Sequence, residues 1–593
     1  MSFCGRRNRV DAHRFVYPRA RPVALHSVYA EKALGRWVDE YPERLGSIGI
    51  DGRGATWREV ATSTRILRHR LERAGASAGD RVAVMAGRSR YALSSLLAIW
   101  AHGSSAVLLD ERHPLERLRW VAQDAGCSVV VSSEPEAAAL ELEVVETAGS
   151  EIDSGGLLLT GSRGAGWVRR EPGAEAYVVY TSGTTGRPKG VRVGVAGVEN
   201  FLATAESLGY RPGSRAVSVV SPGFDGWLWS LLTPFANGAT CVAIDTGLGK
   251  VEQALAEQRI DNLCMTPSLY AVIRELPRVE VAVVAGERCP DSLAERLREN
   301  ADRVINVYGP TETTIAATMS DTARGEDLRT IGRPLPGYSV DVVDADLNEV
   351  PAGVTGEILI GGVGVALGYV GATGPDADRF IEWKGARHFR TGDLGALRTD
   401  GQLSILGRVD NQVKIGGFRV ELEEIESLAC QVRDIEAAVA YVREDPRTLA
   451  LGVRLASGVQ LDDVLRTRLA AMFHARLPRQ LCPTFLHSIA AVPLEPTGKV
   501  SRREVAALGM ADRGRSARAG LVLDRVLAAW SDVFGRSVTA DADFFAIGGH
   551  SLLAAQLAAR VEKELEVTMS ITDVLTAGTP AAMARQIDGT RPA

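Results

Sequence analysis

A loop rich in hydroxyl groups and glycine, at residues 180–191, is the first stretch of the chain that could do chemistry. Its sequence, YTSGTTGRPKGV, follows AYVVY (176–180), a short apolar run typical of a buried strand. The backbone N–H groups of such a loop can surround an anion, while Lys189 adds positive charge. Glycine, serine and threonine also gather in ordinary surface turns. The order of strand, hydroxyl-rich loop and cation favours a phosphate site, and the missing GxxxxGK spacing excludes a Walker loop.

A second loop, YGPTETT at 308–314, follows the apolar run RVINV. Tyr308 could stack on a flat base, Thr311 could donate to a phosphate, and Glu312 could hold Mg²⁺ through oxygen. In open parallel sheets, ligands bind in loops beyond the carboxyl ends of the strands. The alternative for Tyr308 is an ordinary core aromatic residue.

A third set of polar residues lies at 390–426. The stretch RTGDLG (390–395) contains Asp393, whose carboxylate could accept from ribose hydroxyls. The stretch GRVDNQVKIGGFRVELEEIE (407–426) begins with Arg408 and Asp410 and continues as a strand and an acidic helix. Taken singly, Asp393 could equally be a helix N-cap, and the acidic helix a solvated one.

Near the C-terminus, the stretch DFFAIGGHSLLAAQL (543–557) places Ser551 at the start of a predicted helix, directly after a Gly-Gly turn. The commonest role of serine at a helix start is to cap it. The pattern also predicts that this hydroxyl is exposed and has apolar neighbours.

These loops need a scaffold of strands to bring them together. Residues 25–170 alternate helical patterns with short apolar runs such as RVAVMA and CSVVVSS, and the alternation continues to about residue 309. This pattern predicts a largely parallel, doubly wound α/β sheet architecture. Residues 335–410 change to shorter strands and turns, which indicates a β-rich subdomain.

The chain is expected to divide into five segments. The expected segments are an N-terminal tail at 1–24, a large α/β subdomain at 25–409, a small α+β subdomain at 410–510, a polar linker at 511–520 and a helical bundle at 521–588.

Composition narrows the class of protein. A chain of 593 residues with 46% hydrophobic and 24% charged residues is too long for one core. A net charge of −5 gives no reason to expect nucleic acid or an anionic membrane as partner. The seven cysteines form no C-x-x-C pair, which argues against a disulfide framework or a zinc site. With no membrane-length apolar stretch and no signal peptide, we expect a cytoplasmic protein.

In this order, the loops resemble those of the adenylate-forming enzymes, and specifically adenylation domains of non-ribosomal peptide synthetases. The resemblance covers residues 25–510 and includes FDGWLW (224–229), GEILIGGVGVALGY (356–369) and LEPTGKVSRREV (494–505) as well as the loops above. The segment around Ser551 resembles the phosphopantetheine attachment site of peptidyl carrier proteins. An arginine that the family has at residue 416 is glycine here, and an aromatic residue that it commonly has at 405 is isoleucine.

The resemblance implies a role for each matching residue. Lys499 would be the catalytic lysine, Glu312 the Mg²⁺ ligand, Asp410 the hinge between the subdomains and Ser551 the attachment point of 4′-phosphopantetheine. The residues implied to bind ATP are Thr181, Ser182, Gly183, Thr184, Thr185, Gly186, Lys189, Asn306, Tyr308, Thr311, Asp393 and Arg408.

The resemblance also implies a substrate pocket, in which Asp225 grips the α-amino group and Lys499 the carboxylate. The residues implied to line it are Asp225, Gly226, Trp229, Cys264, Val283, Ala285, Val307, Ile315 and Ala316. Apart from Asp225 none is charged, and several are small, so we expect a large aromatic amino acid, tryptophan first and phenylalanine or tyrosine next.

The expected function is therefore ATP-dependent activation of an amino acid and its loading onto the carrier domain, within antibiotic or other secondary-metabolite biosynthesis. Two alternatives are an acyl-CoA ligase with the same core, against which Asp225 argues, and an inactive carrier scaffold, against which Lys499 and Glu312 argue. The expected partners are a phosphopantetheinyl transferase and separate tailoring or condensation enzymes. The resemblance also allows for a small helper protein of the MbtH-like type.

Overall fold

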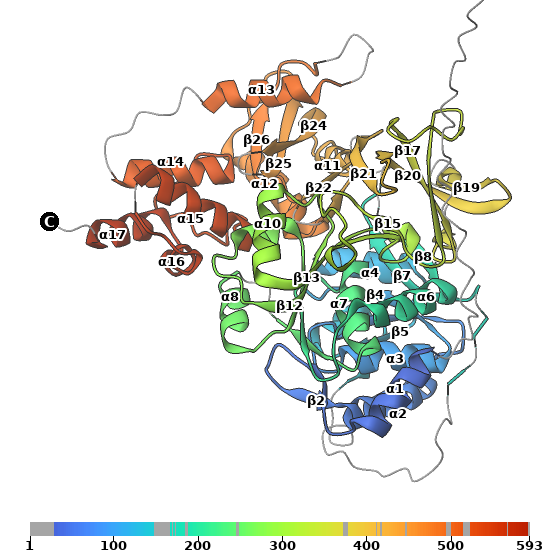
Figure 1. Cartoon of the computed structure of the whole chain (residues 1–593). Coiled ribbons are helices and arrows are strands. Elements are labelled where there is room, and N and C mark those ends of the chain that lie inside the picture. Colours follow the sequence, from blue (N-terminus) through green and yellow to red (C-terminus); the bar gives the residue numbers. More distant parts are fainter. Residues whose placement is uncertain are drawn as a thin grey trace, which may run out of the picture.

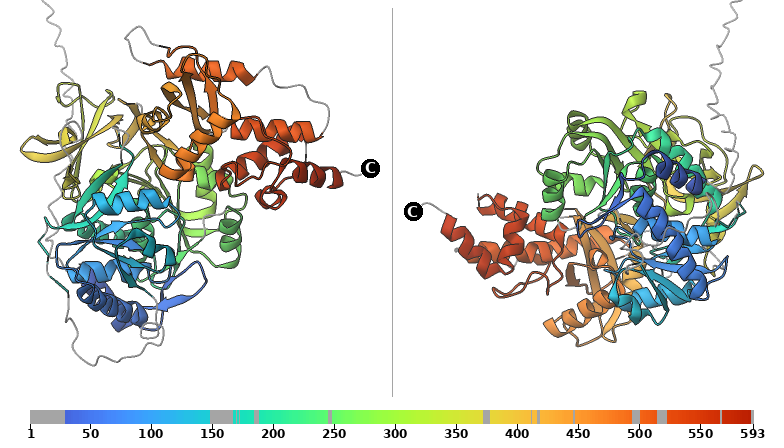
Figure 2. Two further views of the ribbon diagram at one scale, coloured as in Figure 1. Left: turned by 180° about the vertical axis from the view of Figure 1, so that it is seen from behind. Right: turned by 90° about the horizontal axis from the view of Figure 1, so that it is seen from below.

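The computed structural model describes residues 29–147, 167–168, 170–171, 173–183, 188–244, 248–371, 377–410, 412–415, 418–444, 447–493, 500–513, 522–565 and 567–590. The elements form a large subdomain, a small α+β subdomain and a helical carrier domain, which follow one another along the chain (Figure 1). Seen from behind and from below, the carrier domain lies at one side, next to the small subdomain (Figure 2). The fold class expected from the sequence is confirmed.

The larger of two mostly parallel sheets has nine strands in the order β15-β14-β13-β12-β11-β9-β10-β1-β2. The strands are β1 (Leu45–Ile48), β2 (Gly54–Thr56), β9 (Arg215–Ser218), β10 (Thr240–Ala243), β11 (Asn262–Met265), β12 (Val279–Ala285), β13 (Ala301–Tyr308), β14 (Thr318–Asp321) and β15 (Arg333–Pro334). Pairing is parallel from β13 to β1, and antiparallel strands lie only at the two edges.

The second sheet has seven strands in the order β18-β8-β7-β4-β3-β5-β6. The strands are β3 (Arg81–Met85), β4 (Ser105–Leu108), β5 (Val129–Ser132), β6 (Glu143–Glu146), β7 (Glu175–Thr181), β8 (Lys189–Gly194) and β18 (Gly368–Tyr369). Strand β7 ends where the hydroxyl-rich loop begins, and β8 returns from that loop antiparallel to it.

Helices fill the space between the two sheets and cover their outer faces. The helices of the large subdomain are α1 (Tyr29–Glu40), α2 (Trp57–Arg73), α3 (Ala92–His102), α4 (Leu115–Asp124), α6 (Val195–Ala205), α7 (Asp225–Ala236), α8 (Leu248–Glu257), α9 (Pro267–Val272) and α10 (Asp291–Asn300). Side chains of α1, α2, α3, α6 and α7 belong to one core shared by both sheets, whereas α8, α9 and α10 pack on the outer face of the nine-stranded sheet.

Successive residues of β12 face these two cores in turn. Val281 and Val283 lie in the core shared with α7, and Ala282 and Val284 lie in the core under α8 to α10. Because both faces are buried, the strand is a continuous apolar run rather than an alternating one.

A five-stranded antiparallel sheet closes the large subdomain, as expected for residues 335–410. Its strands are β16 (Tyr338–Val343), β17 (Gly356–Gly362), β19 (Phe380–Trp383), β20 (Ala386–Leu397) and β21 (Leu403–Arg408). Ile405, which stands where the related family commonly has an aromatic residue, is partly buried against the main core.

The small subdomain combines a two-stranded hairpin with a three-stranded sheet. Its elements are β22 (Val413–Ile415), β23 (Phe418–Val420), α11 (Leu422–Ala429), β24 (Ile435–Glu444), β25 (Arg447–Leu455), α12 (Asp463–Arg476), β26 (Phe485–Ser488) and α13 (Arg502–Arg513). Helix α13 ends at Arg513, so the first residues of the expected linker at 511–520 continue the helix. The glycines at 416 and 417 lie outside the described residues.

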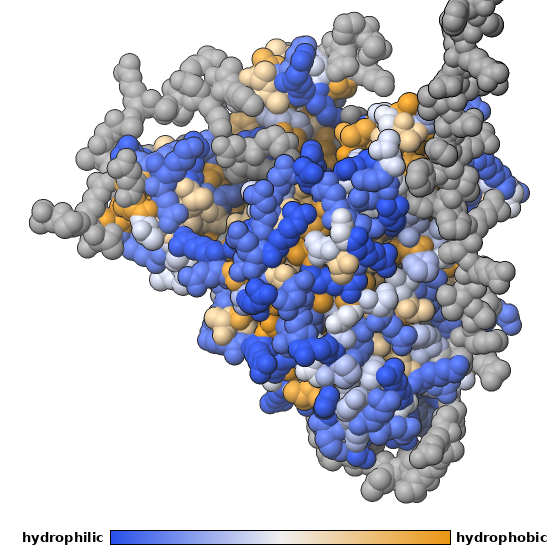
Figure 3. Space-filling model, viewed as in Figure 1, coloured by the Kyte–Doolittle hydropathy of each residue, from blue (hydrophilic) through white to orange (hydrophobic). Residues whose placement is uncertain are grey.

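The carrier domain is the expected helical bundle. Its helices are α14 (Val522–Phe534), α15 (Ser551–Leu565), α16 (Ile571–Ala577) and α17 (Pro580–Thr590), around a core that contains Trp530, Phe534 and Phe544. Hydrophobic residues are scattered over the mainly hydrophilic face of the molecule in Figure 3. Among the described residues, no helix is both long and apolar enough to cross a membrane.

Candidate active site

Three residues expected to bind ATP form one hydrogen-bonded cluster at the carboxyl end of β13. The Tyr308 hydroxyl donates to Asp393 Oδ2 over 2.5 Å, and Arg408 Nη1 donates to Asp393 Oδ1 over 2.5 Å. Strands β20 and β21 pair Asp393 with Arg408 in register, which explains why the two side chains meet. Tyr308 and Asp393 are buried, and burial followed by the charge of Asp393 raises the pKa of Tyr308 well above its ordinary value.

Asp410, the expected hinge, continues this cluster. Arg408 donates to it through Nε over 2.6 Å and through Nη2 over 2.8 Å, and Arg379 Nη2 donates over 2.8 Å. Burial alone would raise the pKa of Asp410, but the hydrogen bonds and charges of the two arginines lower it overall. The first residue of the expected small subdomain is thus held to the nucleotide cluster by charge-assisted bonds.

Of the phosphate-loop residues expected to bind ATP, the structure describes Thr181, Ser182, Gly183 and Lys189. The others, Thr184, Thr185 and Gly186, lie outside the described residues. Thr181 pairs with Lys189 across β7 and β8, so the two ends of the loop lie together. Thr181 Oγ1 is buried without a hydrogen-bond partner among the described residues. A buried donor of this kind can be satisfied by a ligand.

Glu312, the expected metal ligand, lies fully buried in the short helix at Thr311–Thr313. Arg419 Nη1 donates to both of its oxygens, over 3.0 and 2.9 Å, and the Tyr369 hydroxyl donates to Oε1 over 2.7 Å. Burial raises the pKa of Glu312, but Arg419 and Tyr369 lower it overall, so the carboxylate is ionised. Among the described residues, no three His, Cys, Asp or Glu side chains gather as a metal cluster.

Asn306 lies on β13, two residues before Tyr308, and has a structural role. Its Nδ2 donates to the carbonyl oxygens of Leu328 and Thr330, each over 2.9 Å. Both amide hydrogens are therefore used to hold this loop, and only Oδ1 is left for the expected contact with adenine.

Asp225 is the first residue of α7 and is partly buried, with its Oδ2 atom shielded from solvent. Its pKa is raised to about 6, mainly by burial and further by the charge of Glu312, although a hydrogen bond from Thr311 opposes the shift. Its Oδ2 has no hydrogen-bond partner among the described residues. A cation that reached this oxygen would be strongly held, because an unpaired buried carboxylate is costly.

The structure brings the other expected pocket residues to one side of the nine-stranded sheet. Cys264 pairs with Val283, and Ala285 pairs with Val307, on three neighbouring strands. These side chains belong to or pack against the core that contains α7. Three more of the residues expected to line the pocket belong to the same core: Trp229, Ile315 and Ala316. Trp229 packs edge-on against Phe201, with ring centroids 5.4 Å apart, and Gly226 lies one residue after Asp225 in α7.

The hairpin of β22 and β23 faces this site from the small subdomain. Lys414 Nζ lies 5.7 Å from the ring centroid of Tyr308, and burial lowers its pKa. The ring of Phe418 packs edge-on against that of Phe224, which precedes α7, at 4.7 Å. Sequence reasoning assigned no role to Lys414, Phe418 or Arg419, although all three lie in a motif that it quoted. Lys499 lies outside the described residues.

Ser551 begins α15 in the carrier domain and is half-buried. Its hydroxyl makes no hydrogen bond with the described residues, so the capping alternative has no support. The preceding residue, His550, is partly buried, and desolvation together with the charge of Arg479 lowers its pKa to about 4. Ser551 thus follows a neutral histidine in the chain, and its hydroxyl is not engaged by the described residues.

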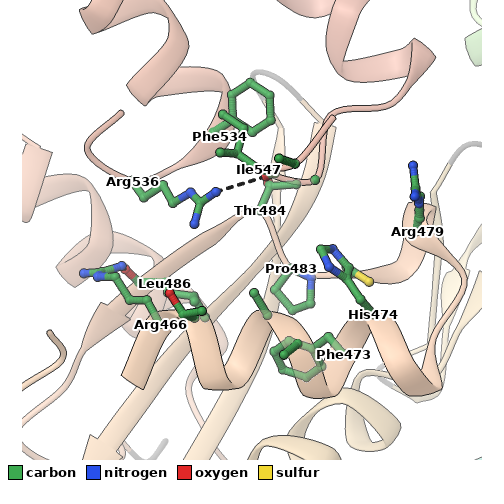
Figure 4. A pocket seen from close by; sticks show the side chains of 16 residues that line it. Arg466, Phe473, His474, Arg479, Pro483, Thr484, Leu486, Phe534, Arg536 and Ile547 are labelled. Carbon is green, nitrogen blue, oxygen red and sulfur yellow. Dashed lines mark hydrogen bonds between the residues drawn. The ribbon is translucent and has the colours of Figure 1, made fainter. Parts of the chain in front are cut away.

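The carrier domain contacts both subdomains. Arg443 Nη1 donates to the Asp532 carbonyl over 3.1 Å, and Arg274 Nη2 donates to the Met569 carbonyl over 2.8 Å. A cavity of about 400 Å³ lies between α12 and the loop before Ser551. Figure 4 shows its side chains: Arg466, His474 and Arg479 come from the small subdomain, and Arg536 and Ile547 from the carrier domain.

The chain matches two family models. Residues 34–370 match the AMP-binding enzyme family, and residues 524–587 match the phosphopantetheine attachment site. Novobiocin biosynthesis protein H of Streptomyces niveus is 35% identical over 555 residues, which are 87% of this chain and 89% of that protein. Phosphinothricin tripeptide synthetase PhsC of Streptomyces viridochromogenes is 33% identical over 587 residues, 96% of this chain but 53% of that protein.

Other relatives are much longer, and tyrocidine synthase 3 of Brevibacillus parabrevis is 31% identical over a region that is 9% of its length. Among solved structures, holo-PA1221, a non-ribosomal peptide synthetase protein containing adenylation and carrier domains, superposes with a TM-score of 0.77 at 24% identity, covering 94% of this chain and 96% of that one. IdnL1 superposes with a TM-score of 0.65 at 27% identity, covering 78% and 98%. The chain belongs to the AMP-binding, adenylate-forming enzymes, as a non-ribosomal peptide synthetase adenylation domain followed by a peptidyl carrier domain.

Proposed function

We propose that the chain activates an amino acid as its aminoacyl-adenylate and then transfers the aminoacyl group to 4′-phosphopantetheine on Ser551. The observation that carries this proposal is Asp225, whose buried Oδ2 has no hydrogen-bond partner among the described residues. Its Thr311 hydrogen bond joins it to the residue directly before Glu312. An unpaired buried carboxylate beside the nucleotide cluster suits a site that receives the α-amino group of a substrate.

In the first half-reaction, Tyr308, Asp393 and Arg408 would hold adenine and ribose, and the loop from Thr181 to Lys189 the outer phosphates. A carboxylate oxygen of the amino acid attacks the α-phosphorus. The bond from that phosphorus to the oxygen that bridges to the β-phosphate breaks, and pyrophosphate leaves with the electron pair. Two anions approach each other in this step, so Lys499 would offset their repulsion and the developing charge.

The residues present fit Mg²⁺ and the phosphopantetheine arm. Mg²⁺ is commonly bound by one or two carboxylates together with substrate phosphates, which suits the single buried carboxylate of Glu312. Ser551 offers a half-buried hydroxyl that makes no hydrogen bond with the described residues, and attachment needs that oxygen. When bound, Mg²⁺ would offset phosphate charge, and the arm would supply the thiol that accepts the aminoacyl group.

The two half-reactions would need different orientations of the small subdomain. Here its β22–β23 hairpin contacts the nucleotide cluster, through Lys414 over Tyr308 and Arg419 on Glu312. Helix α13, which follows Lys499 in the chain, lies on the outer side of the small subdomain (Figure 1). We propose that rotation about Asp410 exchanges the face that the small subdomain presents to the site.

We propose an aromatic substrate, with tryptophan first. The side chains of Cys264, Val283, Val307 and Trp229 share one uncharged core with α7. A charged substrate side chain would be buried there without a partner, which costs several kcal/mol. The missing side chain at Gly226 leaves room for a wide ring, and Trp229 supplies a ring to pack against it.

An acyl-CoA ligase would not need a cation receptor at Asp225, and an inactive scaffold would not need the cluster of Tyr308, Asp393 and Arg408. We propose a phosphopantetheinyl transferase, and downstream tailoring or condensation enzymes, as partners. Dependence on an MbtH-like helper is tested by adding such a protein.

ATP–pyrophosphate exchange tests the proposal. We expect exchange with tryptophan, or with another aromatic amino acid, and none with fatty acids. Preference for an aliphatic or charged amino acid by tenfold, about 1.4 kcal/mol, over every aromatic one would contradict the pocket assignment. Exchange with fatty acids would favour the ligase, and no exchange at all, with and without an MbtH-like protein, would favour the scaffold.

A further inference from the structure

Glu312 and Arg419 form a buried ion pair between the two subdomains. Arg419 Nη1 lies 3.0 and 2.9 Å from the two carboxylate oxygens, and the side chains of Glu312 and Arg419 are 0% and 14% exposed. A buried carboxylate with no cation nearby would be strongly destabilising. Arg419 therefore supplies the positive charge that Glu312 requires in this orientation.

The same stretch of β23 also holds the phosphate loop. The Ser182 hydroxyl donates to the Arg419 carbonyl oxygen over 2.9 Å, and the Glu421 N–H donates to Ser182 Oγ over 3.2 Å. Gln412 Nε2 in turn donates to Glu421 Oε1 over 2.6 Å. The hairpin thus engages both a residue proposed to bind phosphate and the residue proposed to bind the metal ion.

These contacts conflict with bound magnesium and phosphate. A Mg²⁺ ion lies about 2.1 Å from its oxygen ligands and needs nearly octahedral surroundings. The guanidinium of Arg419 spans both oxygens of Glu312, and Tyr369 takes a further site on Oε1. A metal ion placed between the two oxygens of Glu312 would meet Arg419 Nη1, and the two positive charges would repel each other.

Resting on the function proposed above, we infer that Glu312 binds Arg419 and the metal ion alternately. The metal ion in question is the one that accompanies the pyrophosphate product. Arg419 is then a positioning residue for the second half-reaction, because the hairpin docks fully only after the metal ion and pyrophosphate have left. Glu312 keeps a cationic partner in both states, which avoids the cost of an unpaired buried charge.

Lys414 cannot substitute for Arg419 in this role. Its Nζ lies over Tyr308, and the carboxylates that raise its pKa are Asp393 and Glu287 rather than Glu312. Arg476 offers a matched control, because its Nε binds Glu116 over 2.7 Å. That pair also joins the two subdomains, but its side chains are about half exposed and distant in the chain from Glu312.

The test uses the full-length chain and magnesium pyrophosphate as the probe. Calorimetry measures the affinity of the chain for magnesium pyrophosphate. Fluorescence energy transfer between one dye on each subdomain measures the fraction of molecules in which the hairpin is docked. Arg419→Ala removes the side chain that competes with the metal ion, so the affinity for the probe should rise by about fivefold or more. A change of about fivefold is the lower end of the coupling commonly found between two sites. Arg419→Lys keeps a cation and should fall between the parent and Arg419→Ala, and Arg476→Ala should leave the affinity unchanged.

In the parent, the probe should lower the docked fraction, and in Arg419→Ala the docked fraction should no longer respond to it. If both Arg419 variants bound the probe as the parent does, or more weakly, the inference would be overturned and the proposed function would stand. A merely structural contact would not compete with the probe. If the parent bound the probe no better than Glu312→Gln, the metal site of the proposed function would fail, and the inference with it.

Discussion

Replacing Asp225 by asparagine separates two effects of this carboxylate. One is its effect on the stability of the folded protein, and the other is its contribution to binding the substrate. The substitution preserves size and removes the charge. In the parent, burial raises the pKa of Asp225 from 3.8 to about 6. We expect Asp225→Asn to stabilise the free protein at neutral and higher pH while it weakens amino-acid binding.

The magnitude follows from the pKa shift. A shift of about 2 units, at about 1.4 kcal/mol per unit, corresponds to about 3 kcal/mol of stability that the ionised residue costs. Because the folded-state pKa is raised, this cost is absent below about pH 4, grows as the pH rises to about 6, and is complete above that. Losing the buried partner of the substrate ammonium typically costs about 2–5 kcal/mol of binding, a loss of about thirtyfold or more.

The assay combines thermal unfolding with pyrophosphate exchange. The unfolding temperature of Asp225→Asn should exceed that of the parent at pH 8, and the difference should shrink as the pH approaches 4. The KM for the amino acid should rise without a comparable change in the KM for ATP. A variant that is less stable than the parent at pH 8, or that keeps the parental KM, would refute the reasoning.

Three further outcomes follow. In the parent, affinity for the amino acid should fall as the pH drops below about 6, by up to tenfold per unit, because protonated Asp225 cannot pair with an ammonium; a flat profile from pH 5 to 8 would contradict this role. Lys499→Ala should lower adenylation by about a hundredfold or more with ATP binding nearly intact, and parental exchange would rule the lysine out. Asp410→Pro should slow thioester formation more than adenylation; Asp410→Ala, which also loses the two arginine bonds, is its control, and equal losses in both half-reactions would show that Asp410 is not the pivot.

Patterns local in the chain predicted most of the fold. The alternation of apolar runs and helical stretches indicated the parallel sheets, and turn-rich residues after 335 indicated the β-rich subdomain, because sheet and helix periodicities follow from which faces are buried. The resemblance assigned Tyr308, Asp393 and Arg408 to one nucleotide site, and their side chains do meet in the structure. The helix that ends at Arg513 extended into the expected linker because its periodic pattern does not stop at residue 510.

Contacts between subdomains were not predictable in the same way. Arg419 meets Glu312 across 107 residues of chain, and Ser182 meets Glu421 across 239. Such contacts depend on the orientation of two rigid bodies, which no local periodicity encodes. Asn306 shows a second limit, since a polar residue on a buried strand can serve a ligand or a neighbouring loop, and here its amide holds the loop at Leu328 and Thr330.

The most direct test of the central claim is the intact mass of the chain after loading. The protein is first treated with CoA and a phosphopantetheinyl transferase, and then with ATP, Mg²⁺ and each amino acid in turn. We predict a gain of one phosphopantetheine, followed by a second gain equal to one aromatic aminoacyl group, and neither in Ser551→Ala. Phosphopantetheine that persists in Ser551→Ala, or a modified parent that accepts no amino acid while it catalyses exchange, would contradict the claim that the chain loads its own carrier domain.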